Sequence, residues 1–181
     1  MTAADSMIAC LSPLVGDIRQ ETMAPPGLSA WGRALRTLQP CEAWLTSKDW
    51  IERDNPRMAF IVARGLILGS MIPASERTWA ALMRDEARAR LTYLLQPGTI
   101  LCTPTTPFPA PRRGLPISEL DPIRDRILCL CAHGGFTGMP QVSISGATVG
   151  GAPVGLSVLG ARGSDATLVA LAQALSVEPK T

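Results

Sequence analysis

The chain has little charge of either sign and no long hydrophobic run. Its 181 residues carry 17 Lys and Arg against 15 Asp and Glu, a formal charge of +2. Arg84, Arg88 and Arg90 alternate with acidic residues, which is typical of a solvated helix face and not of a nucleic-acid-binding patch. The longest apolar stretch, residues 65–74, is much shorter than the roughly 18 residues that a membrane span needs. We expect neither a nucleic-acid partner nor a membrane span.

The first residues do not resemble a secretory leader either. No Lys or Arg precedes the apolar part of residues 1–21, whereas a leader begins with positive charge. The apolar spacing there instead favours an amphipathic helix. We therefore expect a cytoplasmic protein.

The cysteines do not form a disulfide framework, because their number is odd and they are scattered. They are Cys10, Cys41, Cys102, Cys129 and Cys131. Cys129, Cys131 and His133 suggest a metal site or a Cys–His nucleophile, yet residues two apart on a helix point to different faces. No second cluster supplies the remaining ligands of a four-coordinate zinc. Buried thiols beside an ordinary histidine are the simpler interpretation, and we expect no metal and no cofactor.

Hydrophobic spacing predicts a helical first part and a strand-containing second part. Trp31, Leu35, Leu38 and Leu45 fall on one face of the second predicted helix, as core positions do. The prolines between Pro104 and Pro116 predict an extended loop. The predicted helices cover residues 3–15, 29–47, 57–70, 75–95, 121–133 and 164–175, and the predicted strands cover residues 99–103, 140–145 and 153–159.

The segment from Gly138 to Ala172 is the most informative part of the chain. Val142 and Ile144, and later Val154, Leu156 and Val158, alternate with small or polar residues, which is the period of strands. Glycines between the two runs predict a hairpin. After the hairpin, Ser164 and Asp165 precede an apolar helical pattern, as a helix start requires.

In its residues and their order, this segment resembles the C-terminal end of the amidase signature family. The family comprises serine hydrolases of amides, among them the A subunits of glutamyl-tRNA amidotransferases and the allophanate hydrolases. Residues 102–107, with the sequence CTPTTP, are similar to the family's strand end, and the turn through Pro109 and Gly114 follows as in the family. Residues 38–51 are similar to a further family segment. The resemblance spans nearly the whole chain but covers only the family's C-terminal part.

The resemblance implies an α/β fold in which helices pack on an incomplete mixed β-sheet. It implies that residues 1–181 are the C-terminal fragment of a single amidase domain, helical over about 1–98 and strand-containing over about 99–176. It also implies that the family's Ser nucleophile, second Ser and Lys lie elsewhere, since the chain has no Gly-Ser-rich loop and its lysines are Lys48 and Lys180. We therefore expect no catalytic residue in this chain. We also expect it to be a truncated form that is inactive alone.

Five residues are candidates for the substrate pocket that the resemblance implies: Thr103, Thr105, Arg124, Arg126 and His133. Thr103 and Thr105 end a predicted strand, where side chains reach a cleft, although a proline-stiffened turn is the simpler interpretation. Arg124 and Arg126 precede a segment that selects substrate in the family and suit a carboxylate, although plain solvent exposure is the alternative.

Two functions of different class follow from the sequence. The first is the C-terminal part of an amidase that hydrolyses carbon–nitrogen bonds, with a small amide as substrate once an upstream segment completes it. The second is a non-catalytic binding or scaffold protein with the same fold. An incomplete sheet exposes an edge, so we also expect a homo-oligomer or a partner chain to cover it.

Overall fold

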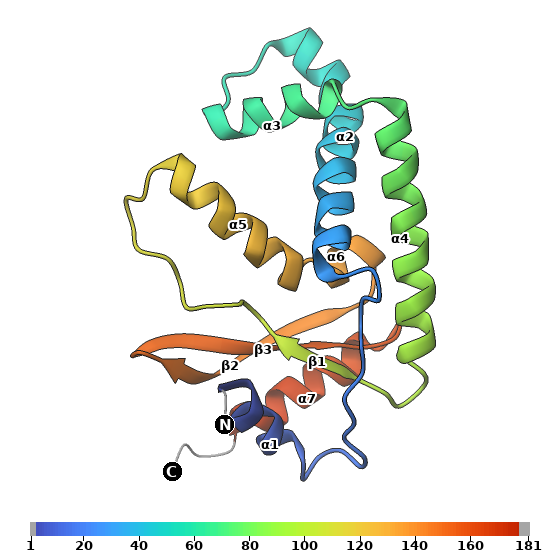
Figure 1. The fold of residues 1–181 in the computed structure, drawn as a ribbon, viewed down its shortest axis with the longest axis vertical. Helices are drawn as coiled ribbons and strands as arrows, with labels where there is room; N and C mark the ends of the chain where they lie inside the picture. Colours follow the sequence, from blue (N-terminus) through green and yellow to red (C-terminus); the bar gives the residue numbers. More distant parts are fainter. Residues whose placement is uncertain (1–2, 178–181) are drawn as a thin grey trace.

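The computed structural model describes residues 3–177, a mixed α/β arrangement that confirms the predicted fold class (Figure 1). The elements are α1 (Ala3–Leu11), α2 (Leu28–Asp54), α3 (Phe60–Ser70), α4 (Ala74–Leu94), β1 (Leu101–Pro104), α5 (Ile117–Cys131), α6 (His133–Thr137), β2 (Gln141–Val149), β3 (Ala152–Leu159) and α7 (Asp165–Val177). No helix among these residues has the length and hydrophobicity that a bilayer span requires.

The sheet is three-stranded, in the order β1-β3-β2, and all its pairings are antiparallel. The predicted glycine-rich hairpin is confirmed. Gly150 and Gly151 join β2 to β3 with φ angles of 57° and 79°, which a tight two-residue turn requires and which only glycine adopts freely. A register shift between Ser145 and Ala147 bends β2 near this turn.

One face of the sheet is covered by α1 and α7 (Figure 1). Leu156 and Val158 of β3 point to this side, where Met7 and Leu11 of α1 and Leu168 of α7 bury them. These alternating positions are the ones that the period-2 pattern of the sequence predicts.

The second hydrophobic core lies on the other side, between α2, α4 and α6. Trp31 and Leu38 of α2 contribute to it as predicted, whereas Leu45 is 57% exposed. Leu45 was wrongly predicted to be core because α2 extends past the end of the core. The buried members are Met23, Ala24, Trp31, Ala34, Leu38, Ala80, Ala87, Leu91, Leu94, Leu95, Phe136, Met139 and Leu159.

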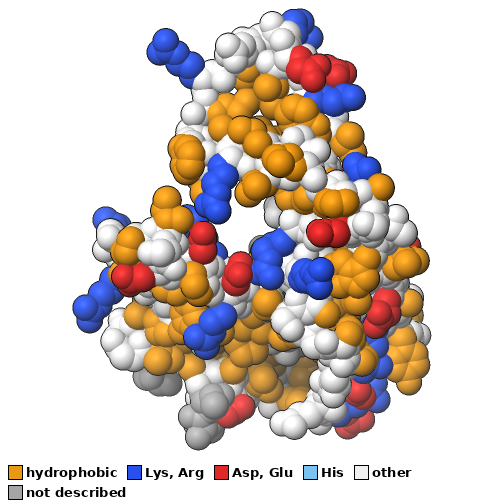
Figure 2. Space-filling view, turned by 45° about the horizontal axis from the view of Figure 1, so that its top comes forward, with side chains coloured by type: hydrophobic (Ala, Val, Ile, Leu, Met, Phe, Trp, Pro, Cys, Tyr) orange, Lys and Arg blue, Asp and Glu red, His pale blue; other side chains and the backbone are white. Residues whose placement is uncertain are grey.

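Helix α3 packs against α2 at one close point. Gly69 lies against the carbonyl of Pro40, and Cys41 Sγ lies 3.4 Å from the Gly69 carbonyl oxygen. Most other side chains of α3 are exposed although they are apolar. Figure 2 shows apolar side chains gathered over this end of the molecule.

Candidate functional site: two clefts on the polar face of the sheet

The face of the sheet opposite α1 and α7 carries a row of hydroxyl groups. In the register of the sheet, Thr103 of β1, Ser157 of β3 and Ser143 of β2 are direct neighbours. Cys102, on the other face, is buried enough that the pKa of its thiol rises to about 11. The strand alternation therefore separates an apolar face from a polar one, and the polar one borders both clefts of this site.

Ser157 is the centre of this polar row. Its side chain is fully buried, and Gln141 Nε2 donates a hydrogen bond to its Oγ at 3.0 Å. Ser157 Oγ also lies 3.3 Å from Ser143 Oγ and donates to Thr105 Oγ1 at 3.4 Å. A hydroxyl has one proton and two acceptor positions. Since Ser157 gives its proton to Thr105, Ser143 donates to Ser157, and the Ser157 hydroxyl is saturated.

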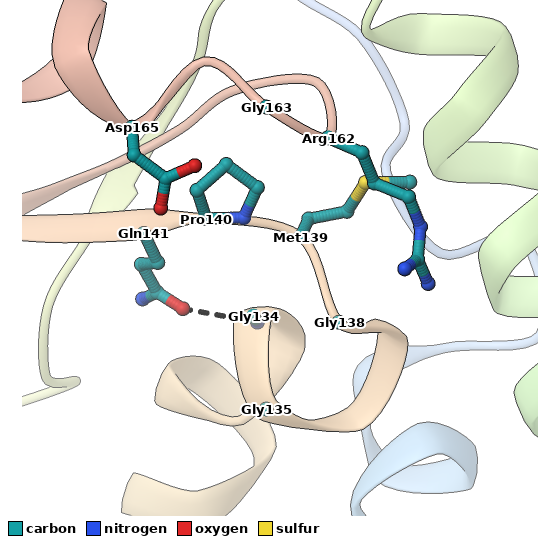
Figure 3. Close-up of a pocket in the computed structure, with 9 residues that line it drawn as sticks. All are labelled: Gly134, Gly135, Gly138, Met139, Pro140, Gln141, Arg162, Gly163 and Asp165. Atoms are coloured by element: carbon teal, nitrogen blue, oxygen red, sulfur yellow. Dashed lines mark hydrogen bonds between the residues drawn. The ribbon is translucent and has the colours of Figure 1, made fainter.

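The first cleft, which we call the glycine cleft, lies at the Gln141 end of this row (Figure 3). It has a volume of about 520 Å³. Its wall is formed by Gly134, Gly135, Gly138, Met139, Pro140, Gln141, Arg162, Gly163 and Asp165.

Glycines bring backbone groups to the surface of this cleft. Gly138 ends α6 with a φ of 75°, and a Cβ there would lie 3.0 Å from Arg162 Nη2. A Cβ on Gly134 would lie 2.5 Å from Gln141 Oε1, to which the Gly134 N–H donates at 3.0 Å. This bond fixes the Gln141 amide, so that one Nε2 proton goes to Ser157 and the second is available to the cleft.

Opposite charges stand on two sides of the glycine cleft. Arg162 Nη2 donates to the Thr137 carbonyl at 2.8 Å, which holds the guanidinium at the cleft wall. Asp165 lies in the first turn of α7, where the helix dipole favours a carboxylate. Figure 3 shows the two side chains separated by the cleft.

The second cleft, which we call the hydroxyl cleft, lies further along the same face. It has a volume of about 360 Å³ and contains no charged side chain. Thr105, Ser143 and Ser145 supply hydroxyls, while Phe108 and Ile127 belong to its apolar part.

The predicted pocket residues are not brought together. Thr105 lines the hydroxyl cleft, and the neighbouring Thr103 has a buried Oγ1 without a hydrogen-bond partner. Arg124 is exposed and lies 3.8 Å from Asp121. Arg126 is exposed too, with its guanidinium 5.1 Å from the Phe108 ring.

His133 is 1% exposed and lines neither cleft. Its ring meets Trp31 edge-on, with 6.0 Å between the centroids. Burial lowers the pKa of His133 to about 4, and a hydrogen bond with the Leu130 backbone partly opposes this. Its Nε2 has no partner. His133 is therefore neutral at pH 7 and lies behind the glycine cleft, next to Gly134.

The cysteines do not form a cluster with His133. Within residues 3–177 no group of three ligating side chains suits a metal ion. Cys131 Sγ donates to the Ile127 carbonyl at 3.0 Å, and burial raises the pKa of this thiol. The expectation of buried thiols is fully met only by Cys41, since Cys102, Cys129 and Cys131 are half-buried. It is wrong for Cys10, which is exposed on the outer side of the short helix α1.

Sequence reasoning missed the residues that define the glycine cleft: Gln141, Arg162 and Asp165. Gln141 begins the polar alternation of β2, so the pattern contained a signal for it. The sequence contained no signal for Arg162, because the backbone turn after β3 determines where its side chain points. Of the two lysines, Lys48 lies on α2 outside both clefts, and Lys180 lies outside the described residues.

Comparisons with known proteins show what the chain is similar to. No protein-family model matches the chain. It is 27% identical over 157 residues to Amidase 1 of Oryza sativa subsp. japonica and 26% identical over 157 residues to Amidase 1 of Arabidopsis thaliana. These alignments cover 86% and 87% of this chain, but the chain spans only 36% and 37% of the length of those relatives.

The fold gives the same result. A crystal structure of an amidase matches 94% of this chain with a TM-score of 0.71, at 23% identity and over 39% of its own length. Kluyveromyces lactis allophanate hydrolase matches 97% of this chain with a TM-score of 0.75, at 19% identity and over 29% of its length. The chain therefore shares the fold of these amidases. It matches the C-terminal part of them, as its sequence predicted.

Proposed function

We propose that the chain is the C-terminal part of an amidase that hydrolyses carbon–nitrogen bonds of small amides. The observation that carries the proposal is the coverage: relatives named amidases match 86% of this chain along about a third of their own length. The proposal includes residues 1–181 as one fragment of a single domain. It also includes a catalytic Ser–cis-Ser–Lys set on a segment outside this chain, so that the chain alone is inactive.

In this proposal the glycine cleft is the chain's share of the substrate pocket. The second Nε2 proton of Gln141 and the guanidinium of Arg162 are donors, and the Asp165 carboxylate is an acceptor. Such fixed groups orient a polar amide, while the nucleophile of the upstream segment attacks its carbonyl carbon, expels the amine and leaves an acyl-enzyme for water to cleave.

The other candidates have more distant roles in the same proposal. Thr105 extends the pocket wall along the sheet, with Thr103 beside it. Arg124 and Arg126 lie on the exposed side of α5, where a carboxylate of a larger substrate or of a partner segment would bind them. His133 supports the turn that precedes Gly134.

A partner segment also fits the sheet. Its outer strands, β1 and β2, pair on one side only within the described residues. Unpaired strand edges bind further strands. The same edges would serve a non-catalytic binding protein, which is the alternative that the test below separates.

The test is ammonia release from a panel of small amides in three samples: this chain, a separately expressed upstream segment of a relative, and their mixture. We expect release in the mixture only. Arg162→Met should reduce it at least tenfold by raising KM, whereas Arg112→Met, on the exposed proline loop, should leave it unchanged. Release by the chain alone would overturn the assignment of catalysis to the upstream segment, and silence of the mixture despite complex formation would favour the binding protein.

A further inference from the structure

Two arginine side chains converge on one backbone oxygen beside the glycine cleft. Arg162 Nη2 donates to the Thr137 carbonyl at 2.8 Å, and Arg88 Nε, from α4, donates to the same oxygen at 3.3 Å. Thr137 itself is fully buried at the end of α6. The charge alternation around Arg88 predicted only a solvated helix face, whereas the structure holds its guanidinium close to that of Arg162.

The Arg162 guanidinium is held in place before any ligand binds. A Cβ on Gly138 would lie 3.0, 3.5 and 3.6 Å from Nη2, Cζ and Nη1 of Arg162, so the guanidinium lies along this glycine. Gly138 also has a φ of 75°, which favours glycine on its own account. Because the side chain is already fixed at the cleft wall, it loses little conformational entropy when it binds a ligand.

The two positive charges are only partly balanced. Among the ion pairs of residues 3–177 none includes Arg162. Asp85 lies 3.4 Å from Arg88 Nη1, but its side chain is 70% exposed, and so exposed a pair interacts weakly. Asp165 stands on the other side of the cleft (Figure 3). The Arg162 end of the cleft is therefore positive, and an anion there would relieve the repulsion between the two arginines.

The two ends of the cleft suit different groups of one ligand. A guanidinium has five N–H donors in a planar fork that matches the two oxygens of a carboxylate, and Arg162 uses one of them on Thr137. At the other end, Gln141 has a free Nε2 proton and Asp165 is an acceptor, which together match the carbonyl oxygen and the NH₂ group of a primary amide. Asp165 repels a carboxylate from that end, so the ligand can enter in one orientation only.

We propose that Arg162, supported by Arg88, binds a carboxylate of the substrate, and that the substrate is therefore the half-amide of a dicarboxylic acid. The inference rests on the proposed function, because it takes the glycine cleft to be part of the substrate pocket, and it narrows small amides to those that carry a carboxylate. Arg162 lines the cleft and is the specificity-determining residue. Arg88 lies behind it and is a positioning residue that adds positive charge.

Nuclear magnetic resonance titration of the full chain tests this with three amides of equal chain length. Succinamate, butyramide and β-alaninamide end in an anionic, an apolar and a cationic group. We expect the backbone amides of Gly138 and Gly163 to report a dissociation constant about tenfold lower for succinamate than for butyramide, with β-alaninamide binding most weakly. Equal affinities for succinamate and butyramide, or tightest binding of β-alaninamide, would overturn the proposal.

Arginine variants test the two side chains. Arg162→Gln should abolish the preference for succinamate over butyramide, and Arg88→Gln should reduce it about threefold. Arg77→Gln removes the same charge from the exposed start of α4, roughly 16 Å along the helix from Arg88, and should preserve the preference. A merely structural role would weaken the binding of both amides equally, so an unchanged preference in Arg162→Gln would refute the carboxylate contact. The comparison of amides on the unaltered chain does not depend on any variant folding.

Kinetics of the mixture with the upstream segment separate this inference from the proposed function. Hydrolysis of succinamate with a lower KM than butyramide would support both. Hydrolysis of the two amides with equal KM would uphold the amidase and reject the carboxylate subsite. Preferential binding of succinamate by the chain without hydrolysis of any amide by the mixture would uphold the subsite and count against the amidase.

Discussion

His133 is the only histidine in the chain, and burial of its ring links stability to pH. Its pKa is about 4 in the folded protein and about 6.5 when exposed. The unfolded chain therefore binds more protons between these values, so the stabilisation is complete above pH 6.5 and is lost as the pH falls toward 4. We expect the free energy of unfolding, measured in urea, to drop by about 3 kcal/mol over this range.

Histidine resonances provide a direct check, because they report this residue alone. They should not titrate between pH 7 and pH 5. In His133→Gln the loss of stability between pH 6.5 and 5 should largely disappear, even if the variant is less stable throughout. A midpoint near 6.5 in the folded protein would contradict the burial.

Ser157 makes the second prediction at this scale. Replacing it with alanine removes the hydrogen-bond partner of the half-buried Gln141 Nε2, whereas the Ser143 hydroxyl is exposed and can bond to water instead. We expect Ser157→Ala to lower the free energy of unfolding by about 1–2 kcal/mol. Ser145→Ala, on the exposed part of β2, should change it by less than about 0.5 kcal/mol. Equal effects of Ser157→Ala and Ser145→Ala on the free energy of unfolding in a denaturation experiment would show that the hydroxyl row does not stabilise the fold.

Among the elements, α3 offers a matched pair of glycines. A Cβ on Gly69 would overlap the Pro40 carbonyl, whereas a Cβ on Gly65 of the same helix meets nothing within 4 Å. Gly69→Ala should force α3 away from α2 and cost about 1–3 kcal/mol. Gly65→Ala should stabilise by up to about 1 kcal/mol through helix propensity. Thermal unfolding of both variants tests this, and a neutral Gly69→Ala would contradict the close packing.

The regular elements were largely predictable from sequence, whereas their ends were not. The hairpin and α7 were found because alternation, turn glycines and a helix start all agree. Helix α5 begins at Ile117 and not near Asp121, although Asp121-Pro122 resembles a start. Pro116 at the N-cap begins the helix, and Pro122 is tolerated inside it. The short helix α6 has too few residues to show a period.

For the whole molecule, the exposed apolar surface of α3 predicts self-association. Phe60, Ile67 and Met71 are 70%, 58% and 71% exposed, although they are large and apolar. We expect the chain alone to form oligomers in size-exclusion chromatography with light scattering. Serine at these three positions should yield a monomer, while Leu82→Ser, an exposed apolar position on α4, should not. A monomeric unaltered chain would contradict the prediction.

The site as a whole was less predictable than the fold. Thr105 was found because a strand ends there, yet its contact with Ser157, which lies about 50 residues further along the chain, was not. Arg162 and Asp165 line the same cleft as Gln141 only because the chain turns back toward β2 after β3. Patterns in the sequence do not show which distant residues lie side by side, because these contacts depend on strand register and on backbone direction.

The contacts of α1 with the sheet can form only late in synthesis. This helix packs on β2 and β3, which leave the ribosome about 130 residues later, and Met7 lies against Gly146. During translation α1 therefore remains without its partners until nearly all of the sequence has been made. In that interval the apolar face of α1 stays exposed, and a chain released early would contain paired α2 and α4 but an unpacked α1.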